Sequence, residues 1–243
     1  MMEDVDMDSI KKYFKMIKYG LQVRTMIILT VIFFVLGIIY ELIDFNSNGI
    51  IPFSGLYLGI AGTYIYSVLM TPTVSALIQT SAMKRKLQGA VPAIFAGACT
   101  LITFTVFMLL RFFVGLPRLL KADPAADTTI IYVNTFCTAV LLAVLFIYYS
   151  FSYRYYVVST VVLCIFLIPT LFIFIRIDWP LARDIFKFVS GITEAVGGGA
   201  VIALSYVIIL IGIAMCYGFN LLLYRKPISA LAYRAALRQA ESK

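Results

Sequence analysis

The sequence predicts an all-α, polytopic membrane protein with six transmembrane helices in a single domain, residues 1–243. Its composition is 62% hydrophobic and 13% charged, with a mean hydropathy of +0.98, whereas soluble domains are about 45–50% apolar and 25% charged. Several charge-free runs approach or exceed the roughly 20 residues that a helix needs to cross about 30 Å of hydrocarbon. The alternating ten-residue strands of a membrane barrel are absent. An all-helical bundle is therefore the expected fold.

The six spans are placed where charges are missing, because a charge at the bilayer centre costs about 2.5–3.5 kcal/mol even on insertion scales. Glu41 and Asp44 close the first span, Arg111 closes the third and Arg176 closes the fifth. We expect these charges at membrane interfaces, with no ion relay in the core. The spans cover residues 25–44, 50–70, 89–112, 129–152, 155–176 and 199–223.

The distribution of cations predicts the orientation of the chain. If both termini are cytoplasmic, every lysine and arginine lies on the cytoplasmic side except Arg111, Arg118, Lys121, Arg176, Arg183 and Lys187. Cytoplasmic loops of membrane proteins carry such an excess of positive charge. The acidic N-terminus lacks the layout of a signal peptide, so the first span is expected to stay attached. The prediction is a multi-pass protein of the cell membrane whose net charge of +8 reflects topology and attraction to anionic lipid, without nucleic-acid binding.

The segment before the first span is expected to form an interfacial helix over residues 8–24. Asp8 is a suitable N-cap, and Ile10, Phe14, Ile17 and Leu21 recur at helical spacing with lysines on the other faces. Such a helix lies in the membrane interface and does not cross it. The alternative is an ordinary basic flank of the first span.

The stretch TPTVSALIQTSAMKRKLQ between the second and third spans predicts a short cytoplasmic helix over residues 73–86. Pro72 ends the preceding span, and Thr73 or Ser75 is a candidate N-cap. The partly amphipathic segment ends in a cluster of three cations, and its candidate docking residues are Val74, Leu77, Ile78, Met83, Lys84, Arg85 and Lys86. The alternative is a loop whose cations only fix the topology.

The segment DWPLARDIFKFVSGITEAVGGG, of which residues 178–198 are assigned to the outer leaflet and the last glycine begins the sixth span, is too polar to span and alternates apolar anchors with charges. One or two short helices that dip into the outer leaflet are expected here, the alternative being a plain extracellular loop. The anchors are Trp179, Leu181, Ile185, Phe186, Val189, Ile192 and Val196. Glycines 197–199 allow a sharp turn into the sixth span. Residues 224–243 are expected to form a cytoplasmic tail.

This layout resembles the permease subunit of an ABC exporter of the ABC-2 type. The matching stretches are DSIKKYFKMIKYGLQ, TVSALIQTSAMKRKLQ and DWPLARDIFKFVSGITEAVGGG, which correspond to the interfacial helix, the coupling helix and the outer-leaflet helices of that family. The resemblance covers essentially the whole chain and rests on layout and length. It implies a homodimer or a pairing with a paralogous permease, an ABC ATPase partner subunit that binds ATP and Mg²⁺, and contact with that ATPase through residues 73–86.

The sequence contains few groups suited to catalysis. Histidine is absent, and Cys99, Cys137, Cys164 and Cys216 lie singly within predicted spans, where they are expected to act as small apolar side chains. No lysine follows a glycine, which excludes a GxxxxGK[ST] phosphate loop. We therefore expect no enzyme activity, no cofactor and no metal in this chain, and ATP hydrolysis only in a partner.

Uncharged polar residues in the spans are candidates for lining a translocation pathway, although many are expected to form hydrogen bonds between helices instead. They are Thr63, Tyr64, Tyr66, Ser67, Thr100, Thr103, Thr105, Asn134, Thr135, Thr138, Ser205 and Tyr206. Export of a hydrophobic or amphipathic substrate, such as an antimicrobial or toxin peptide, is the first expectation. The alternative is a membrane protein not driven by ATP: a small carrier, a substrate-capture subunit or an immunity scaffold.

Small residues recur in the second and third spans and favour close helix packing within one chain over a dimer contact. They are Gly55, Gly59, Gly62, Gly89, Ala93, Ala96 and Gly97.

Overall fold

The computed structural model describes residues 15, 17, 23–44, 53–70, 86–122, 128–175 and 180–230, and every secondary-structure element in these ranges is a helix. The all-helical fold class is therefore confirmed for the described part of the chain. The elements are α2 (Val23–Asp44), α3 (Phe53–Met70), η2 (Lys86–Ala90), α5 (Val91–Leu110), η3 (Arg111–Gly115), α6 (Leu116–Ala122), α7 (Thr129–Ser152), α8 (Tyr156–Ile175), α9 (Pro180–Val196) and α10 (Gly198–Leu223).

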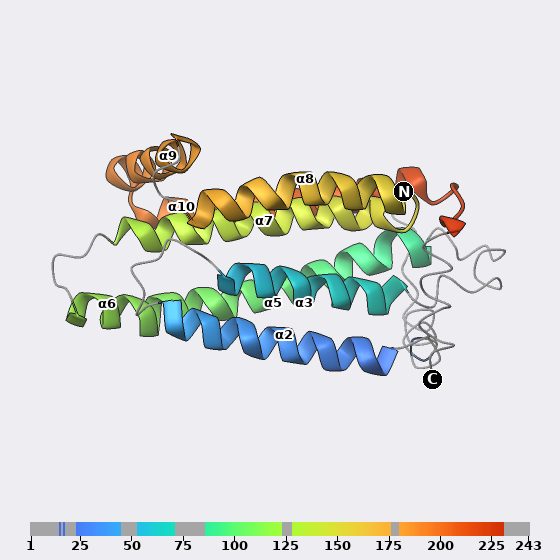
Figure 1. Ribbon diagram of the computed structural model, residues 1–243, viewed down its shortest axis with the longest axis horizontal. Coiled ribbons are helices and arrows are strands. Elements are labelled where there is room, and N and C mark those ends of the chain that lie inside the picture. The colour runs from blue at the N-terminus through green and yellow to red at the C-terminus, as the bar shows by residue number, and fades with distance from the viewer. Residues whose placement is uncertain are drawn as a thin grey trace.

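The long helices α2, α3, α5, α7, α8 and α10 lie side by side along one axis, and α9 lies crosswise to them near one end (Figure 1). We call this end, where α2 finishes and α7 and α10 begin, the α9 end. We call the other end the basic end, because Arg24, Arg154, Arg225 and Lys226 belong to it. Helix ends that were expected on the same side of the membrane thus lie at the same end of the bundle.

Four helical stretches in the described ranges are long and apolar enough to cross a membrane: Val23–Ile43, Gln88–Lys121, Thr129–Ser152 and Gly198–Leu223. Two shorter apolar helical stretches, Ser54–Met70 and Tyr156–Phe166, lie among them. The length and composition of these helices therefore support a membrane protein.

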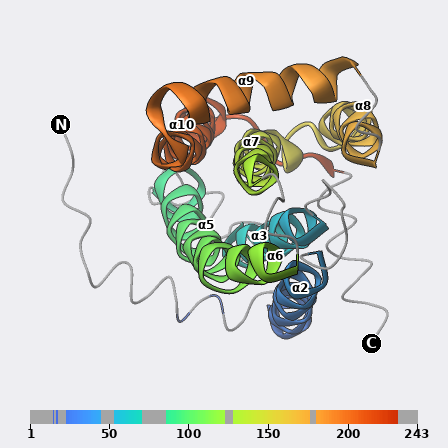
Figure 2. The same cartoon turned by 90° about the vertical axis from the view of Figure 1, so that its left-hand side faces the viewer.

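Helix α7 is the central element of the bundle. It packs most extensively against α10 and also contacts α3, α8 and α9 (Figure 2). Its residues Leu142 and Phe146 are almost completely buried in two neighbouring hydrophobic clusters with side chains of α3, α5 and α10. Burial of an aliphatic or aromatic side chain contributes about 1.5–3 kcal/mol, so α7 holds the other helices in place.

The peripheral helices expose apolar side chains on their outer faces. On α2, Val31 is 55% exposed, and on α8, Ile165 is 67% exposed. Contiguous apolar surface of this kind is unfavourable in water and is the surface that a helix surrounded by lipid presents. The apolar composition of these helices and the exposure of their apolar side chains thus both indicate helices that contact lipid.

The glycines of α3 and α5 pack within the chain, as the sequence favoured. A Cβ atom at Gly55 would meet Thr138 Oγ1 of α7 at 2.7 Å, and one at Gly97 would meet Ile213 Cγ2 of α10 at 2.9 Å. Gly59 lies against Leu145 of α7 in the same way. These small residues let α3 and α5 approach their neighbours closely.

The third predicted span extends further than expected. The prediction ended at residue 112, whereas the helix continues through the π-helical turn η3 and through α6 to Ala122. Pro117 has no N–H group for the carbonyl four residues earlier, and a local π-helical adjustment accommodates such a proline without breaking the helix. The ends of α2, α7, α8 and α10 lie within two residues of the predicted span ends.

Helix α9 is a single amphipathic helix at the place predicted for the outer-leaflet segment. Val189 is fully buried against Val133 of α7 and Val201 of α10, while the charged residues Arg183, Asp184, Lys187 and Glu194 are exposed. Gly197 has a φ of 96° and separates α9 from α10, as expected of the triple glycine. Among the predicted anchors, Val196 is 74% exposed at the end of α9 beside this turn and does not pack within the chain as Val189 does.

Other expectations fall largely outside the described residues. The helix expected over residues 73–86 is described only at Lys86, where η2 begins, and the tail only as far as residue 230. Of the interfacial helix over residues 8–24, the residues before Val23 are described only at Lys15, which is exposed, and Ile17, which is buried in the hydrophobic core.

Candidate functional site: two buried polar clusters

A buried ion pair links η3 to α2 near the α9 end of the bundle. Arg111, the first residue of η3, donates from Nη2 to Glu41 Oε2 of α2 at 2.9 Å and also from Nε to Oε1 of the same carboxylate. The two residues are 4% and 2% exposed. Bidentate pairing of this kind is the strongest geometry that arginine offers a carboxylate.

Two hydroxyl groups complete this ion-pair cluster. Arg111 Nη2 donates to Ser54 Oγ of α3 at 3.3 Å, and Nη1 donates to Thr135 Oγ1 of α7 at 3.2 Å. Arg111 therefore connects α2, α3 and α7 through one planar group. We define the ion-pair cluster as Glu41, Ser54, Arg111 and Thr135.

Glu41 and Arg111 were expected at a membrane interface, with no ion relay in the core, and both lie near helix ends at the α9 end of the bundle; their pairing with each other was not predicted. The sequence predicted both charges on the same side of the membrane, because Glu41 closes the first span and Arg111 closes the third. This shared side was the sequence signal for their pairing. Sequence reasoning treated them separately, because the lateral order of helices is not encoded in their periodicity. Thr135 had been assigned only a generic pathway role.

Asn134 lies beside the ion-pair cluster on α7. Its side-chain Oδ1 is buried and has no hydrogen-bond partner among the residues that the structure describes. A buried amide oxygen without a partner is unfavourable by about 1–3 kcal/mol. Among the predicted pathway residues, Asn134 is thus the one with an unused buried acceptor.

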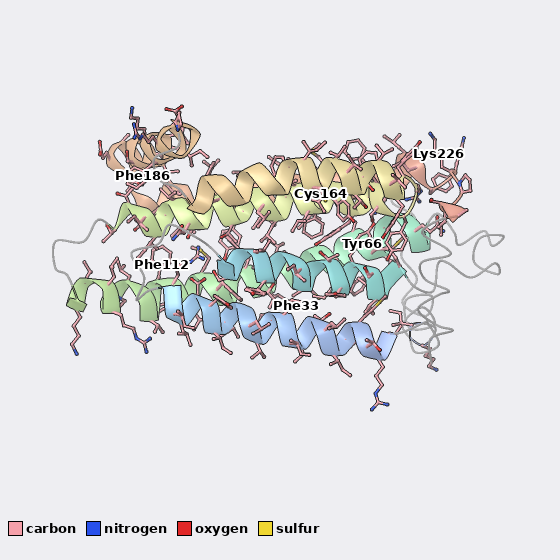
Figure 3. The ribbon with its side chains drawn as sticks, in the orientation of Figure 1. Phe33, Tyr66, Phe112, Cys164, Phe186 and Lys226 are labelled. Atoms are coloured by element: carbon pink, nitrogen blue, oxygen red, sulfur yellow. The ribbon has the colours of Figure 1, made fainter. Side chains whose placement is uncertain are left out.

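A second group of polar residues lies nearer the basic end. Tyr149 of α7 donates to the carbonyl oxygen of Gly59 at 2.9 Å, and its hydroxyl is 2.8 Å from Thr63 Oγ1. Its ring stacks on Tyr66 of α3 with 5.0 Å between centroids. Tyr66, in turn, accepts a hydrogen bond from Asn220 Nδ2 of α10 at 2.9 Å. Figure 3 shows Tyr66 pointing between the helices.

This tyrosine cluster, Thr63, Tyr66, Tyr149 and Asn220, brings together two of the predicted pathway residues. Sequence reasoning missed Tyr149 and Asn220, which occur in otherwise apolar stretches of α7 and α10. Their signal was the presence of polar side chains within long apolar runs. Only the packing showed that they meet.

Arg154 is buried where α7 turns into α8. The residue is 7% exposed and donates from Nη2 to Gln88 Oε1 at 3.3 Å, and Gln88 itself is fully buried. The Nε of Arg154 is buried and has no hydrogen-bond partner in the described part of the chain. Burial lowers the pKa of the Arg154 guanidinium, but arginine remains protonated in proteins. A cation therefore lies at the basic end of the bundle interior.

The remaining predicted pathway residues are dispersed. The hydroxyls of Thr103, Thr105, Thr138 and Ser205 bond to the preceding turn of their own helix. Tyr206 of α10 pairs with Thr105 of α5 at 2.8 Å, and Tyr64 stacks on Phe33 of α2. The contacts of Tyr206 and Tyr64 agree with the expectation that such residues join helices, whereas the bonds within one helix do not. The residues in this group are Tyr64, Ser67, Thr100, Thr103, Thr105, Thr138, Ser205 and Tyr206.

An apolar cavity of about 140 Å³ lies between α2, α3 and α5. Thr30 and Thr103 are its polar lining residues, and both hydroxyls bond to backbone oxygens of their own helices. The cavity therefore offers only apolar surface, and it is separate from the two polar clusters. Its lining residues are Thr30, Val31, Phe34, Leu58, Ala61, Gly62, Ile65 and Thr103.

The described residues contain no group of three or more cysteine, aspartate or glutamate side chains able to hold a metal ion. The four cysteines are free, with Cys137 and Cys216 buried and Cys164 exposed on the outer face of α8 (Figure 3). The predicted ATPase-coupling residues Val74, Leu77, Ile78, Met83, Lys84 and Arg85 lie outside the described residues. Lys86 is placed only by its backbone, at the start of η2.

No protein-family model matches the chain, and neither the curated proteins nor the solved structures contain a significant match to it. For the part of the chain that the structure describes, fold and site define the class: a helical bundle with four helices long and apolar enough to span a membrane and two polar clusters in its interior.

Proposed function

We propose that this protein is the transmembrane permease subunit of an ATP-driven exporter of the ABC-2 type. In this proposal α3 and α8 also cross the membrane, giving six spans. Their 18 and 20 residues correspond to about 27 and 30 Å at 1.5 Å per residue, which matches the hydrocarbon thickness of about 30 Å. The exposed apolar face of α8 supports contact with lipid.

The observation that carries the proposal is the position of α9. An amphipathic helix between the fifth and sixth long helices lies crosswise near one end, with Val189 buried and its charges exposed (Figure 2). The ABC-2 layout requires a short outer-leaflet helix at this place in the chain. An ordinary extracellular loop has no reason to bury an apolar face against two spans.

The same proposal assigns the sides of the membrane. The basic end is cytoplasmic and the α9 end is external, because cytoplasmic segments carry the excess of lysine and arginine. The ATPase subunit then docks at the basic end through residues 73–86, and a second copy or a paralogous permease completes the transporter. The substrate is a hydrophobic or amphipathic molecule such as a peptide, which suits an interior with uncharged polar groups and apolar surface.

Affinity purification from the native membrane in mild detergent tests the proposal. The expected result is co-purification of a phosphate-loop ATPase, whose activity in reconstituted vesicles depends on this chain. Leu77→Asp or Ile78→Asp is expected to abolish assembly or ATP turnover without preventing membrane insertion, because each places a charge in an apolar docking contact. Ala195→Asp, exposed on α9 at the opposite end, is the matched control and is expected to leave ATP turnover intact.

Recovery of no ATPase from native membranes would contradict the exporter. If both aspartate variants assemble and turn over ATP like the parent protein, residues 73–86 act only in topology, and the exporter then needs another docking surface.

The buried ion pair favours a second candidate function, an ion-coupled carrier. Carboxylates inside membrane bundles frequently serve in proton or ion coupling, and Glu41 is such a carboxylate with Arg111 as its partner. A carrier would move substrate in vesicles under an imposed proton gradient without ATP, and Glu41→Gln would abolish this transport. ATP-dependent transport in the absence of a gradient would instead support the exporter.

A further inference from the structure

Arg154 is a buried cation without a counter-charge in the described structure. Its guanidinium donates to the neutral amide of Gln88, and its buried Nε has no partner among the described residues. Burying a charge without an opposite charge is strongly unfavourable unless other groups replace the lost water. By contrast, the guanidinium of Arg111 at the α9 end is paired with Glu41 and two hydroxyl groups.

The ends of neighbouring helices offset part of this penalty. Helices α3, α7 and α10 finish at the basic end, so their carbonyl groups point toward it (Figure 1). A helix C-terminus favours a nearby cation, but the effect is small beside the desolvation of a buried charge. The helix ends therefore do not by themselves account for a buried guanidinium.

No acidic residue of the described ranges lies at the basic end. The acidic residues of those ranges, Glu41, Asp44, Asp184 and Glu194, belong to the end of α2 and to α9. Lys226 bonds to the hydroxyl of Tyr155, the residue after Arg154, and Arg225 precedes Lys226 in the chain. The charged residues that the structure describes at this end are therefore all positive.

We propose that Arg154 and Gln88 form a binding site for a phosphate group at the basic end of the bundle. Gln88 holds one edge of the Arg154 guanidinium in place. The remaining N–H groups of the guanidinium can then donate to phosphate oxygens in the planar geometry that arginine prefers. Lys226 and Arg225 increase the local concentration of anions. The phosphate belongs either to the headgroup of an anionic phospholipid or to a free phosphate ion. The inference concerns this site alone and does not depend on the exporter.

Ligand-dependent thermal unfolding of the full-length protein, purified in an uncharged maltoside detergent, tests the site. One arm adds phosphatidylglycerol, one adds phosphatidylcholine as the zwitterionic reference, and one adds sodium phosphate. Native mass spectrometry measures retained lipid in parallel. The expected result is stabilisation of the parent protein by one of the two anions, with at least a tenfold loss of apparent affinity in Arg154→Gln.

Arg24→Gln is the matched control, since it removes an exposed cation from the same end of the bundle, at the start of α2. It is expected to bind within about twofold of the parent protein, because general attraction of anions is weak and screened by salt. Stabilisation by phosphatidylglycerol alone identifies the lipid as the source, and stabilisation by sodium phosphate identifies the free ion. Absence of any response, or an equal response in Arg154→Gln, overturns the proposal.

Gln88→Glu keeps the proposal testable if Arg154→Gln does not fold. This substitution supplies a carboxylate at nearly the same position as the amide that Arg154 already contacts. The variant is expected to unfold at a higher temperature than the parent without ligand and to lose the response to the anion, because its own carboxylate occupies the guanidinium. A Gln88→Glu protein that responds to the anion like the parent contradicts the site.

Discussion

Arg111 is the residue that most changes the interpretation of this chain. It lies at the end of α5 and yet contacts α2, α3 and α7 through its pairing with Glu41, Ser54 and Thr135. Helix α2 otherwise packs mainly on α3 and exposes much of its surface. The pair is therefore a specific attachment of α2 to the rest of the bundle.

Removal of one partner of this pair is expected to destabilise the protein more than removal of both. Glu41→Gln or Arg111→Gln leaves a buried charge unpaired, and we expect each to lower the free energy of unfolding by about 3–5 kcal/mol. Glu41→Met combined with Arg111→Met removes both charges and is expected to be closer to the parent. Denaturant unfolding in detergent micelles measures the difference.

Arg118→Gln is the control for this comparison, because Arg118 is exposed on α6 at the same end. It is expected to change the free energy of unfolding by less than about 0.5 kcal/mol. A double variant that is as unstable as the sum of the single variants would show that the two residues do not act as a pair.

At the scale of the elements, the crossing of α7 and α10 determines how the bundle closes. Gly212 of α10 lies against the backbone of Ala143 of α7, where an added Cβ would be 2.6 Å from Ala143 Cα. A backbone atom cannot turn aside as a flexible side chain can. Any larger residue at Gly212 must therefore push the two helices apart.

Gly212→Ala is expected to destabilise the protein by about 1–3 kcal/mol, the usual effect of overpacking a close contact. Gly218→Ala is the matched control on the same helix, since a Cβ at Gly218 meets no atom within 4 Å. Alanine is the better helix former by about 1 kcal/mol, so this control is expected to be neutral or stabilising. Thermal unfolding in detergent compares the two, and equal midpoints would show that the crossing tolerates a methyl group.

At the scale of the whole molecule, the two ends of the bundle differ in charge and shape. The described basic end carries Arg24, Arg154, Arg225 and Lys226 without an acidic residue, whereas the other end carries α9 with charges of both signs. The segments assigned to one side of the membrane therefore lie at one end of the bundle, as the proposed orientation requires.

Cysteine labelling in intact cells checks the orientation. In a background without the four native cysteines, Ala195→Cys is expected to react with a membrane-impermeant maleimide from outside, because Ala195 is exposed on α9. Lys226→Cys and Ser81→Cys are expected to react only after permeabilisation, because the excess of cations keeps their end inside. Labelling of Ser81→Cys in intact cells would contradict the six-span topology.

Local sequence patterns were enough to predict the helical class, the position of most helix ends and the amphipathic segment that forms α9. These features follow from local quantities: the length of charge-free runs, the 3.6-residue spacing of apolar side chains, and the glycine at position 197 whose φ of 96° ends a helix. Even the extension of the third helix to Ala122 is a local effect: the charge of Arg111 had been taken to close the span, and the helix continues past it.

Only the tertiary structure decided which polar residues meet. Glu41 and Arg111 are 70 positions apart in the chain, and Tyr66 and Asn220 are 154 apart. Their pairing depends on the lateral order and rotation of the helices, which arise from close contacts such as Gly212 on Ala143 and Gly55 on Thr138. Periodicity gives the apolar face of one helix but not its neighbour. The buried ion pair and the isolated cation at Arg154 therefore became visible only once the helices were packed.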